Sequence, residues 1–204
     1  MTVGPDGPTR SSAFDEDYYR RFYASRETRV QGPREVGEFC TRALLQIKWA
    51  GGEVLSALDV GAGPGLWRDW FARRRPTTRY RSTDVSPYAC ARYGHEQRDV
   101  TTWRAREKFD LVICQGVLPY LTRPGVVAAI ENLAAMSRGF LYLEAVTKRD
   151  LDELCDAEKT DGGMRRHPGA LYRKHLQKHF ASLGFGLWIK RDASARLYEL
   201  ERGP

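Results

Sequence analysis

The chain has 204 residues, which is enough for one well-packed α/β domain and too few for two full ones. Its net charge of +7 is carried by basic residues dispersed along the sequence, so a solvated surface explains the charge better than a nucleic-acid interface does. The four cysteines form no C-x-x-C pair, and we find neither a signal segment nor an apolar run of roughly 18 residues, which predicts a reduced, cytoplasmic protein without membrane association.

The N-terminal fifty residues predict a tail followed by two helices. Residues 1–12 are rich in Gly, Pro, Ser and Thr, so we expect them to be disordered. An aromatic helix is expected over 14–23, and a loop with two arginines follows it. An amphipathic helix should then run from Pro33 to the glycine pair at 51–52, because its apolar residues recur at three- and four-residue steps.

A buried strand over 53–60, a glycine-rich turn and a helix beginning at Leu66 come next. The turn, 61–65, lacks β-carbons at three positions, so a nucleoside could lie close to its backbone. Its spacing is G-x-G-x-G, whereas a dinucleotide fingerprint needs its third glycine one place later, at Leu66. Asp59 adds a carboxylate at the strand end, which favours a ligand with positive charge, such as a sulfonium with an α-ammonium group.

This string resembles the first motif of class I S-adenosylmethionine-dependent methyltransferases, and the later motifs extend the resemblance over most of the chain. The resemblance implies S-adenosylmethionine as the cofactor and S-adenosylhomocysteine as the product. The residues of this stretch that it places around the cofactor are Asp59, Gly61, Ala62, Gly63 and Gly65.

In similar methyltransferases an N-terminal helix closes over the cofactor and the acceptor. The resemblance therefore implies that Tyr18, Tyr19 or Tyr23 lines the site, and Tyr19 is our candidate for a cofactor contact. In the loop after this helix, either Arg26 or Arg29 could pair with the cofactor carboxylate, and we take Arg29 as the candidate. The alternative for these side chains is packing or exposure at the surface.

The next predicted strand, 78–84, ends in an acid about 20 residues beyond the glycine loop. At such a strand end the carboxylate of Asp84 can accept hydrogen bonds from both ribose hydroxyls, with Val85 beside it. The alternative is that Asp84 caps the following helix, but Ser86 before a proline is the better cap.

A short third strand is expected over 95–100. Its end, Asp99-Val100, resembles the third motif of the family, in which the carboxylate accepts the adenine amino group and the neighbouring residue meets the ring. Three acids thus follow three successive strands. Open parallel sheets bind ligands at the edge where the strands end, so these acids should face one ligand.

The most apolar segment, 109–114, predicts a central parallel strand that opens into 115–120. This Gln-Gly-Val-Leu-Pro-Tyr string lacks the sequences typical of nucleobase and glutamine methyltransferases, and it is similar to the segment of many small-molecule methyltransferases. By that resemblance Gln115 or Gly116 contacts the methionine part of the cofactor, and Tyr120 faces the acceptor.

Further candidates for catalysis lie in the C-terminal half. Glu144 falls near the end of an apolar strand over 139–146, where it is either the partner of an arginine or an acceptor-side base. Residues 147–167 are polar and resemble an insertion that carries acceptor specificity. His167 in this insertion is a candidate base, because a neutral imidazole can take a proton near pH 7. His175 and His179 have metal-pair spacing but no third ligand, so we expect no metal site.

The remaining sequence completes the expected fold. A helix over 171–183 and two antiparallel strands, 184–190 and 196–200, joined at 192–194, should close the sheet. The fold class is therefore α/β: a Rossmann-like, seven-stranded, mostly parallel sheet with helices on both faces and a C-terminal antiparallel hairpin. Residues 13–204 form one domain, with 13–50 as N-terminal helices and lid, and the protein is a monomer or homodimer.

These observations predict a methyltransferase that acts on a nitrogen or oxygen of a small-molecule acceptor. One alternative keeps the chemistry and makes RNA or protein the acceptor, although nucleic acid is disfavoured by the missing motifs. Another alternative is a cofactor-binding module without turnover, acting through partner proteins.

Overall fold

Seven strands form a single sheet in the order β3-β2-β1-β4-β5-β7-β6 in the computed structural model, which describes residues 13–29 and 31–194. Strands β1 to β5 pair in parallel, and β7 runs antiparallel to both of its neighbours. This arrangement confirms the predicted fold class. The strands are β1 (Ser56–Val60), β2 (Arg79–Asp84), β3 (Glu96–Gln97), β4 (Phe109–Gln115), β5 (Ser137–Glu144), β6 (Phe180–Gly184) and β7 (Leu187–Lys190).

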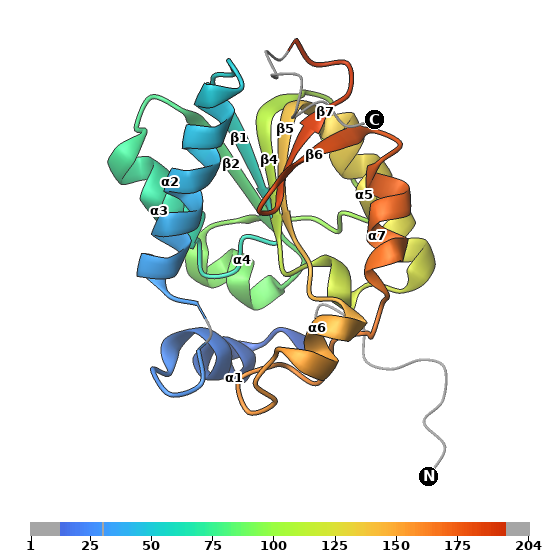
Figure 1. The fold of residues 1–204 in the computed structure, drawn as a ribbon. Coiled ribbons are helices and arrows are strands. Elements are labelled where there is room, and N and C mark those ends of the chain that lie inside the picture. The colour runs from blue at the N-terminus through green and yellow to red at the C-terminus, as the bar shows by residue number, and fades with distance from the viewer. Residues whose placement is uncertain (1–12, 30, 195–204) are drawn as a thin grey trace.

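Helices cover both faces of the sheet (Figure 1). One face carries α2 and α3, and the other carries α5 and α7. None of the helices in the described part of the chain is long and apolar enough to cross a membrane. The helical segments are α1 (Glu16–Tyr19), the π-helical η2 (Arg20–Ala24), α2 (Pro33–Trp49), α3 (Leu66–Arg74), α4 (Pro87–Tyr93), the 3-10 turn η3 (Leu118–Tyr120), α5 (Arg123–Met136), α6 (Lys148–Glu153) and α7 (Gly169–Leu176).

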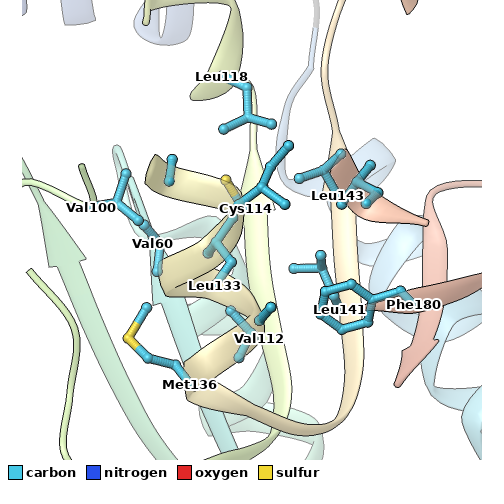
Figure 2. Close-up of a cluster of buried hydrophobic side chains, with 14 of the residues drawn as sticks. Val60, Val100, Val112, Cys114, Leu118, Leu133, Met136, Leu141, Leu143 and Phe180 are labelled. Atoms are coloured by element: carbon cyan, nitrogen blue, oxygen red, sulfur yellow. The ribbon is translucent and has the colours of Figure 1, made fainter. Parts of the chain in front are cut away.

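The two-residue period of the strands divides the buried residues between two cores. In β4, Val112 and Cys114 point toward α5, whereas Leu111 and Ile113 point toward α2 and α3. Figure 2 shows the first of these cores, where Leu133 and Met136 of α5 cover the β4 residues. Because β4 is buried on both faces, it is the rigid centre from which the neighbouring strand ends are positioned.

The third strand is much shorter than predicted. Only Glu96 and Gln97 pair with β2, and the chain leaves the sheet before Asp99. As the edge of the sheet, β3 has a neighbour on one side only, so few backbone hydrogen bonds keep it extended. Asp99 lies instead in a turn, where its Oδ1 accepts hydrogen bonds from the backbone and hydroxyl of Thr101 at 2.8 and 2.7 Å.

The predicted C-terminal hairpin is wrong in its position. The helix expected over 171–183 ends at Leu176, and Phe180–Gly184 is strand β6 rather than helix. The chain reverses around Phe185, where three consecutive residues have positive φ, and not at 192–194. Phe180 and Leu183 fit a helical period, but the two glycines beside Phe185 favour a turn at that place. The predicted strand 196–200 and the tail 1–12 lie outside the described residues.

The segments that close one end of the sheet come from distant parts of the sequence. In Figure 1, α1 and α6 lie together beyond the end of the sheet where the glycine loop follows β1. The loop after α6 is attached to η3, because the Arg165 amide donates to the Pro119 carbonyl at 2.8 Å. This end of the sheet therefore has a roof made from the N-terminal helices and the 147–167 segment.

Candidate functional site

The glycine loop after β1 is held against β2 by its own backbone. The amides of Gly61 and Ala62 both donate to the Thr83 carbonyl, at 2.9 and 3.0 Å. Gly61 has φ +71°, and a β-carbon there would lie 2.3 Å from Cγ2 of Val117. This position therefore requires glycine for two reasons, the left-handed backbone and the close approach of the next loop.

Asp84 connects the glycine loop to the start of α4. Its Oδ2 accepts from the Gly63 amide at 2.9 Å, and its Oδ1 accepts from the Ser86 amide at 2.8 Å. Burial raises the pKa of Asp84, while these two hydrogen bonds act in the opposite direction. The cap of α4 is Ser86, whose hydroxyl accepts from the Ala89 amide, as predicted. Each carboxylate oxygen of Asp84 retains a second lone pair for a ligand.

His95 fastens the loop from the other side, a role that the sequence analysis missed. Its ring is buried, and Nε2 lies 2.9 Å from the Gly63 carbonyl while Nδ1 lies 2.8 Å from Oγ of Ser82. Burial lowers the pKa of His95, so the neutral ring donates from Nε2 and accepts the Ser82 hydroxyl at Nδ1. Gly63 is thus bonded through its amide to Asp84 and through its carbonyl to His95.

Asp59 is almost fully buried below the loop. Its Oδ2 accepts from the Tyr80 hydroxyl at 2.7 Å. Burial raises the pKa of Asp59 to about 7, although the Tyr80 hydrogen bond lowers it. A positively charged ligand beside Asp59 would therefore be stabilised by a carboxylate that forms no ion pair within residues 13–29 and 31–194.

Two adjoining cavities lie at this end of the sheet. The first, of about 70 Å³, lies over the ends of β1, β2 and β4 and the turn after β3. Among its lining residues are the predicted cofactor residues Tyr19, Gly61, Gly63, Asp84, Val85, Asp99, Val100, Gln115 and Gly116. The structure therefore brings together residues from four separate motifs, as their order along the chain predicted.

The second cavity, of about 190 Å³, lies beside the first, toward β5 and the loop after α6. Of the predicted residues it adds Asp59, Ala62 and Glu144. Seven residues line both cavities, so the two share a wall: Tyr18, Tyr23, Gly61, Gly63, Gln115, Gly116 and Tyr120.

Among the described residues Glu144 is held by amide side chains and not by an arginine, which corrects one of the two interpretations made from the sequence. Its Oε1 accepts from Nε2 of Gln31 at 3.0 Å, and its Oε2 accepts from Nε2 of Gln115 at 2.8 Å. Gln115 is itself oriented by Trp67, whose Nε1 donates to Oε1 at 2.7 Å. The N–H groups thus aim the carboxylate at a fixed place in the wall of the second cavity.

Aromatic rings from α1 and η2 cover both cavities. Tyr19 stacks against Tyr23 and Tyr88 with ring centroids 5.5 and 5.6 Å apart, and the Tyr18 and Tyr120 hydroxyls are 3.1 Å apart. Burial raises the pKa of Tyr18 to about 12 and raises that of Tyr120 as well. Near pH 7 these phenols are therefore neutral hydrogen-bonding groups and not phenolates.

Three predicted site residues lie outside the walls of these cavities. Arg29 lies beside Gly32 at the start of α2 and lines neither cavity. Backbone hydrogen bonds lower the pKa of Glu35 most, and the charge of Arg29 lowers it further. Gly65 is the N-cap of α3, with φ +78°. His167 is buried, and its Nε2 donates to the Leu121 carbonyl at 2.8 Å, which anchors the 147–167 segment on the chain after η3.

Other wall residues had escaped the sequence analysis. Gln31 and Trp67 orient the Glu144 carboxylate, and Asp161 and Lys159 bring charges from the loop after α6. Only the polarity of 147–167 hinted at the last two. Trp67 followed the apolar pattern expected of a scaffold helix, and it does pack in the core while its indole N–H reaches the site.

The parallel sheet, its order, the glycine loop and the acids at the strand ends define the architecture of class I methyltransferases. In sequence, residues 58–138 match a family model described as a methyltransferase domain. The match runs from β1 through the start of β5 and so includes the glycine loop, Asp84 and Asp99. The match agrees with the resemblance that the motifs indicated, and it covers the part of the chain that contains them.

Solved structures with this fold include the N-methyltransferase NodS from Bradyrhizobium japonicum WM9 in complex with S-adenosyl-l-homocysteine. NodS has a TM-score of 0.56 and 20% identity over 80% of this chain and 90% of that one. Magnesium protoporphyrin IX methyltransferase from Synechocystis PCC 6803, with bound SAM, has a TM-score of 0.60 and 15% identity, with coverages of 88% and 94%. An S-adenosylmethionine-dependent methyltransferase from Clostridium acetobutylicum ATCC 824 has a TM-score of 0.57 and 12% identity, over 76% of this chain and 89% of that one. At these identities the similarity is one of fold.

In the search of curated proteins, no sequence matched this chain.

Proposed function

We propose that this chain binds S-adenosylmethionine and transfers its methyl group to a nitrogen or oxygen of a small-molecule acceptor, leaving S-adenosylhomocysteine. The observation that carries the proposal is the pair of cavities with a common wall at the carboxyl end of the strands. One cavity has the acids and the glycine loop suited to a nucleoside, and the other leaves room beside it for a second molecule. The solved neighbours that hold SAM or its product support the same cofactor.

The residues around the first cavity fit the nucleoside part of the cofactor. Asp84 offers free lone pairs to the two ribose hydroxyls, while its other contacts hold Gly63 close below. Asp99 and Val100 line this cavity, and they would contact the adenine, the first by accepting the amino group and the second through its apolar side chain. Tyr19 would cover the nucleoside from above.

The sulfonium and the α-amino acid part would extend toward the second cavity. Asp59 supplies a buried carboxyl below the loop, and Gln115 and Gly116 lie in the wall that the two cavities share. A cationic ligand so placed offsets the cost of keeping Asp59 charged in a buried position.

The bound cofactor supplies a methyl group that is already electrophilic on its sulfonium. The protein then has to align an acceptor lone pair with the S–CH3 bond and exclude water. The hydroxyls of Tyr18 and Tyr120 are neutral donors and acceptors that can orient the acceptor at the common wall. Glu144 in the second cavity is the candidate to accept a proton from the acceptor. His167 does not fit this role, because it lines neither cavity and its Nε2 donates to the Leu121 carbonyl.

The size and walls of the second cavity support a small acceptor more than RNA or a protein. The cavity has a volume of about 190 Å³, and Tyr18, Tyr23 and the loop after α6 cover it. We propose that residues 13–50 act as a lid and that 147–167 select the acceptor. All four cysteines are free, which supports a reducing compartment, and we propose the cytoplasm.

Calorimetric titration with S-adenosylmethionine, S-adenosylhomocysteine and NAD tests the cofactor. We expect micromolar binding of the first two and none of NAD, because the loop lacks the third glycine of a dinucleotide site. A screen of small acceptors for S-adenosylhomocysteine formation then tests turnover. Failure of both titrations would contradict the proposal, and binding without turnover of any acceptor would favour a module that acts through partners.

A further inference from the structure

The walls of the second cavity contain information about the acceptor. Tyr18, Tyr23 and Tyr120 lie at its boundary with the first cavity, where the transferred methyl would lie under the proposed function. Beyond this boundary the cavity continues past Glu144 and the loop residues 155–164. An acceptor would therefore place its reacting atom near the phenols and the rest of its structure against these walls.

The charges on the lining residues are predominantly negative. Carboxyl groups are contributed by Asp59, Glu144 and Asp161, and one ammonium group by Lys159. Lys159 has a carboxylate neighbour already, since its Nζ lies 3.6 Å from Oδ2 of Asp156. S-adenosylmethionine with its sulfonium, ammonium and carboxylate brings one net positive charge, so it cannot balance both Glu144 and Asp161.

Glu144 and Asp161 both act on the phenols of the common wall. After burial, which is the largest cause, the charge of Asp161 raises the pKa of Tyr18 and of Tyr120. Glu144 likewise adds to the raised pKa of Tyr23, again after burial. The two carboxylates therefore approach the boundary from different elements, Glu144 from the end of β5 and Asp161 from the loop after α6.

Aromatic rings form another part of the wall of the second cavity. The rings of Tyr18, Phe22, Tyr23 and Tyr120 line the cavity, and the Tyr18 ring lies 5.1 Å from that of Phe22. Aromatic faces attract cations, and they do so more strongly where water is excluded. Rings together with carboxylates favour a cation, whereas an anionic acceptor would meet repulsion and a neutral alcohol would leave the carboxylates without an opposite charge.

We propose that the acceptor is an amine, which binds as its ammonium between the aromatic rings and the carboxylates of Glu144 and Asp161. This inference rests on the proposed function, which it narrows to N-methylation. The ammonium first loses a proton to one of these carboxylates or to water. The nitrogen lone pair then forms the N–C bond as the C–S bond breaks, with its electron pair remaining on sulfur, and the product nitrogen carries the positive charge.

The test compares acceptors of matched shape at saturating S-adenosylmethionine, with S-adenosylhomocysteine formation as the readout. The panel pairs arylalkylamines with their alcohols and carboxylic acids, for example 2-phenylethylamine with 2-phenylethanol and phenylacetate. We expect kcat/KM for the best amine to exceed that of its alcohol by about tenfold or more, the size of a charge-assisted contact. If no amine exceeds its alcohol, the inference is overturned.

Variants distinguish the wall charges from a general effect on folding. D161N should raise the KM of the best amine about tenfold and leave the affinity for S-adenosylhomocysteine unchanged. E144Q should also raise the KM of the amine, and it should lower kcat because it removes the carboxylate proposed to accept the proton. E153Q is the matched control, because Glu153 lies on α6 of the same segment, pairs with Arg149 and does not line the cavity.

The outcomes separate this inference from the proposed function. If the wild-type protein binds neither S-adenosylmethionine nor its product, both fail. If it binds them and methylates alcohols or acids preferentially, the proposed function stands and the amine inference is overturned. An equal KM for amine in D161N, E144Q and E153Q would likewise overturn the role of these carboxylates.

Discussion

The two cavities are built in different ways. The first is formed at strand ends, where the Thr83 carbonyl accepts from the Gly61 amide and the side chains of Asp84 and His95 hold Gly63. The second is closed by short helices and a loop, which are held by contacts between residues far apart in the sequence, such as those of Tyr18, Gln31 and His167. Proteins with this fold can therefore keep the same ligand site at the strand ends while different roof segments select different second ligands.

Substitution of Gly61 should have the largest effect on the first cavity. G61A adds a β-carbon 2.3 Å from Cγ2 of Val117 at φ +71°, so we expect a loss of about 3 kcal/mol in stability and a large loss of cofactor affinity. G94A is the control, because Gly94 has φ +76° and no atom of the described residues lies within 4 Å of its added β-carbon. Urea unfolding and calorimetry of both variants measure the difference, and equal losses would show that backbone strain alone matters.

Removal of the Asp84 carboxylate should weaken cofactor binding by about 2–3 kcal/mol, because charge-assisted bonds to the ribose are lost. D84A also leaves the amides of Gly63 and Ser86 without their acceptor. Calorimetry with S-adenosylhomocysteine measures the change, and E38Q on the exposed face of α2 is the control. Unchanged affinity in D84A would contradict the ribose assignment.

His95 tests whether the loop is positioned from its carbonyl side. H95L removes the donor to Gly63 and leaves a buried carbonyl without a partner, so we expect a loss of about 1–3 kcal/mol in stability and weaker cofactor binding. H95Q keeps an N–H donor and should recover part of the affinity. If H95L and H95Q bind the product equally well, His95 contributes packing only.

We expect the buried carboxyl of Asp59 to make the stability of the ligand-free protein depend on pH. Burial raises its pKa to about 7 from the ordinary 3.8, so the folded state holds a proton that the unfolded state releases. The contribution of Asp59 is therefore complete below about pH 4, falls as pH rises to about 7 at a rate of up to about 1.4 kcal/mol per unit, and is constant above.

Urea unfolding of the wild type and D59N between pH 5 and 8 measures the contribution of Asp59 to the free energy of unfolding. The stability of the wild type relative to D59N should fall as the pH rises through this range. A constant difference would show that Asp59 has an ordinary pKa.

The smallest effect is expected in the roof. Y18F removes the hydroxyl contact with Tyr120 but keeps the ring, so we expect a cost of about 0.5–1.5 kcal/mol, seen as a higher acceptor KM with unchanged product affinity. Y172F is the control, since the Tyr172 hydroxyl is buried without a hydrogen-bond partner in the described part of the chain. A change in product affinity in Y18F would place this hydroxyl on the cofactor side.

Much of the cofactor edge could be predicted because it follows from local patterns. The G-x-G-x-G turn after a buried strand, and acids after the next strands, come from residues close in the sequence whose periodicity indicates where each strand ends. Asp84 and Val85 accordingly line the first cavity. Two exceptions have physical reasons. Strand β3 is short because it is at the edge of the sheet. The β6–β7 turn depends on the two glycines beside Phe185, whereas the apolar spacing of 171–183 had predicted a helix up to that place.

The sequence by itself determined the order of strands and helices, the glycine loop and the acids that follow the strands. Only the tertiary structure decided that Glu144 is paired with Gln31 and Gln115, that His167 anchors a segment, and that Arg29 lies away from the cavities. The physical reason is the distance along the sequence between the residues that interact. Strand ends are set by local periodicity, whereas the roof joins α1, β5 and the loop after α6, and such contacts between distant segments depend on packing that no short pattern encodes.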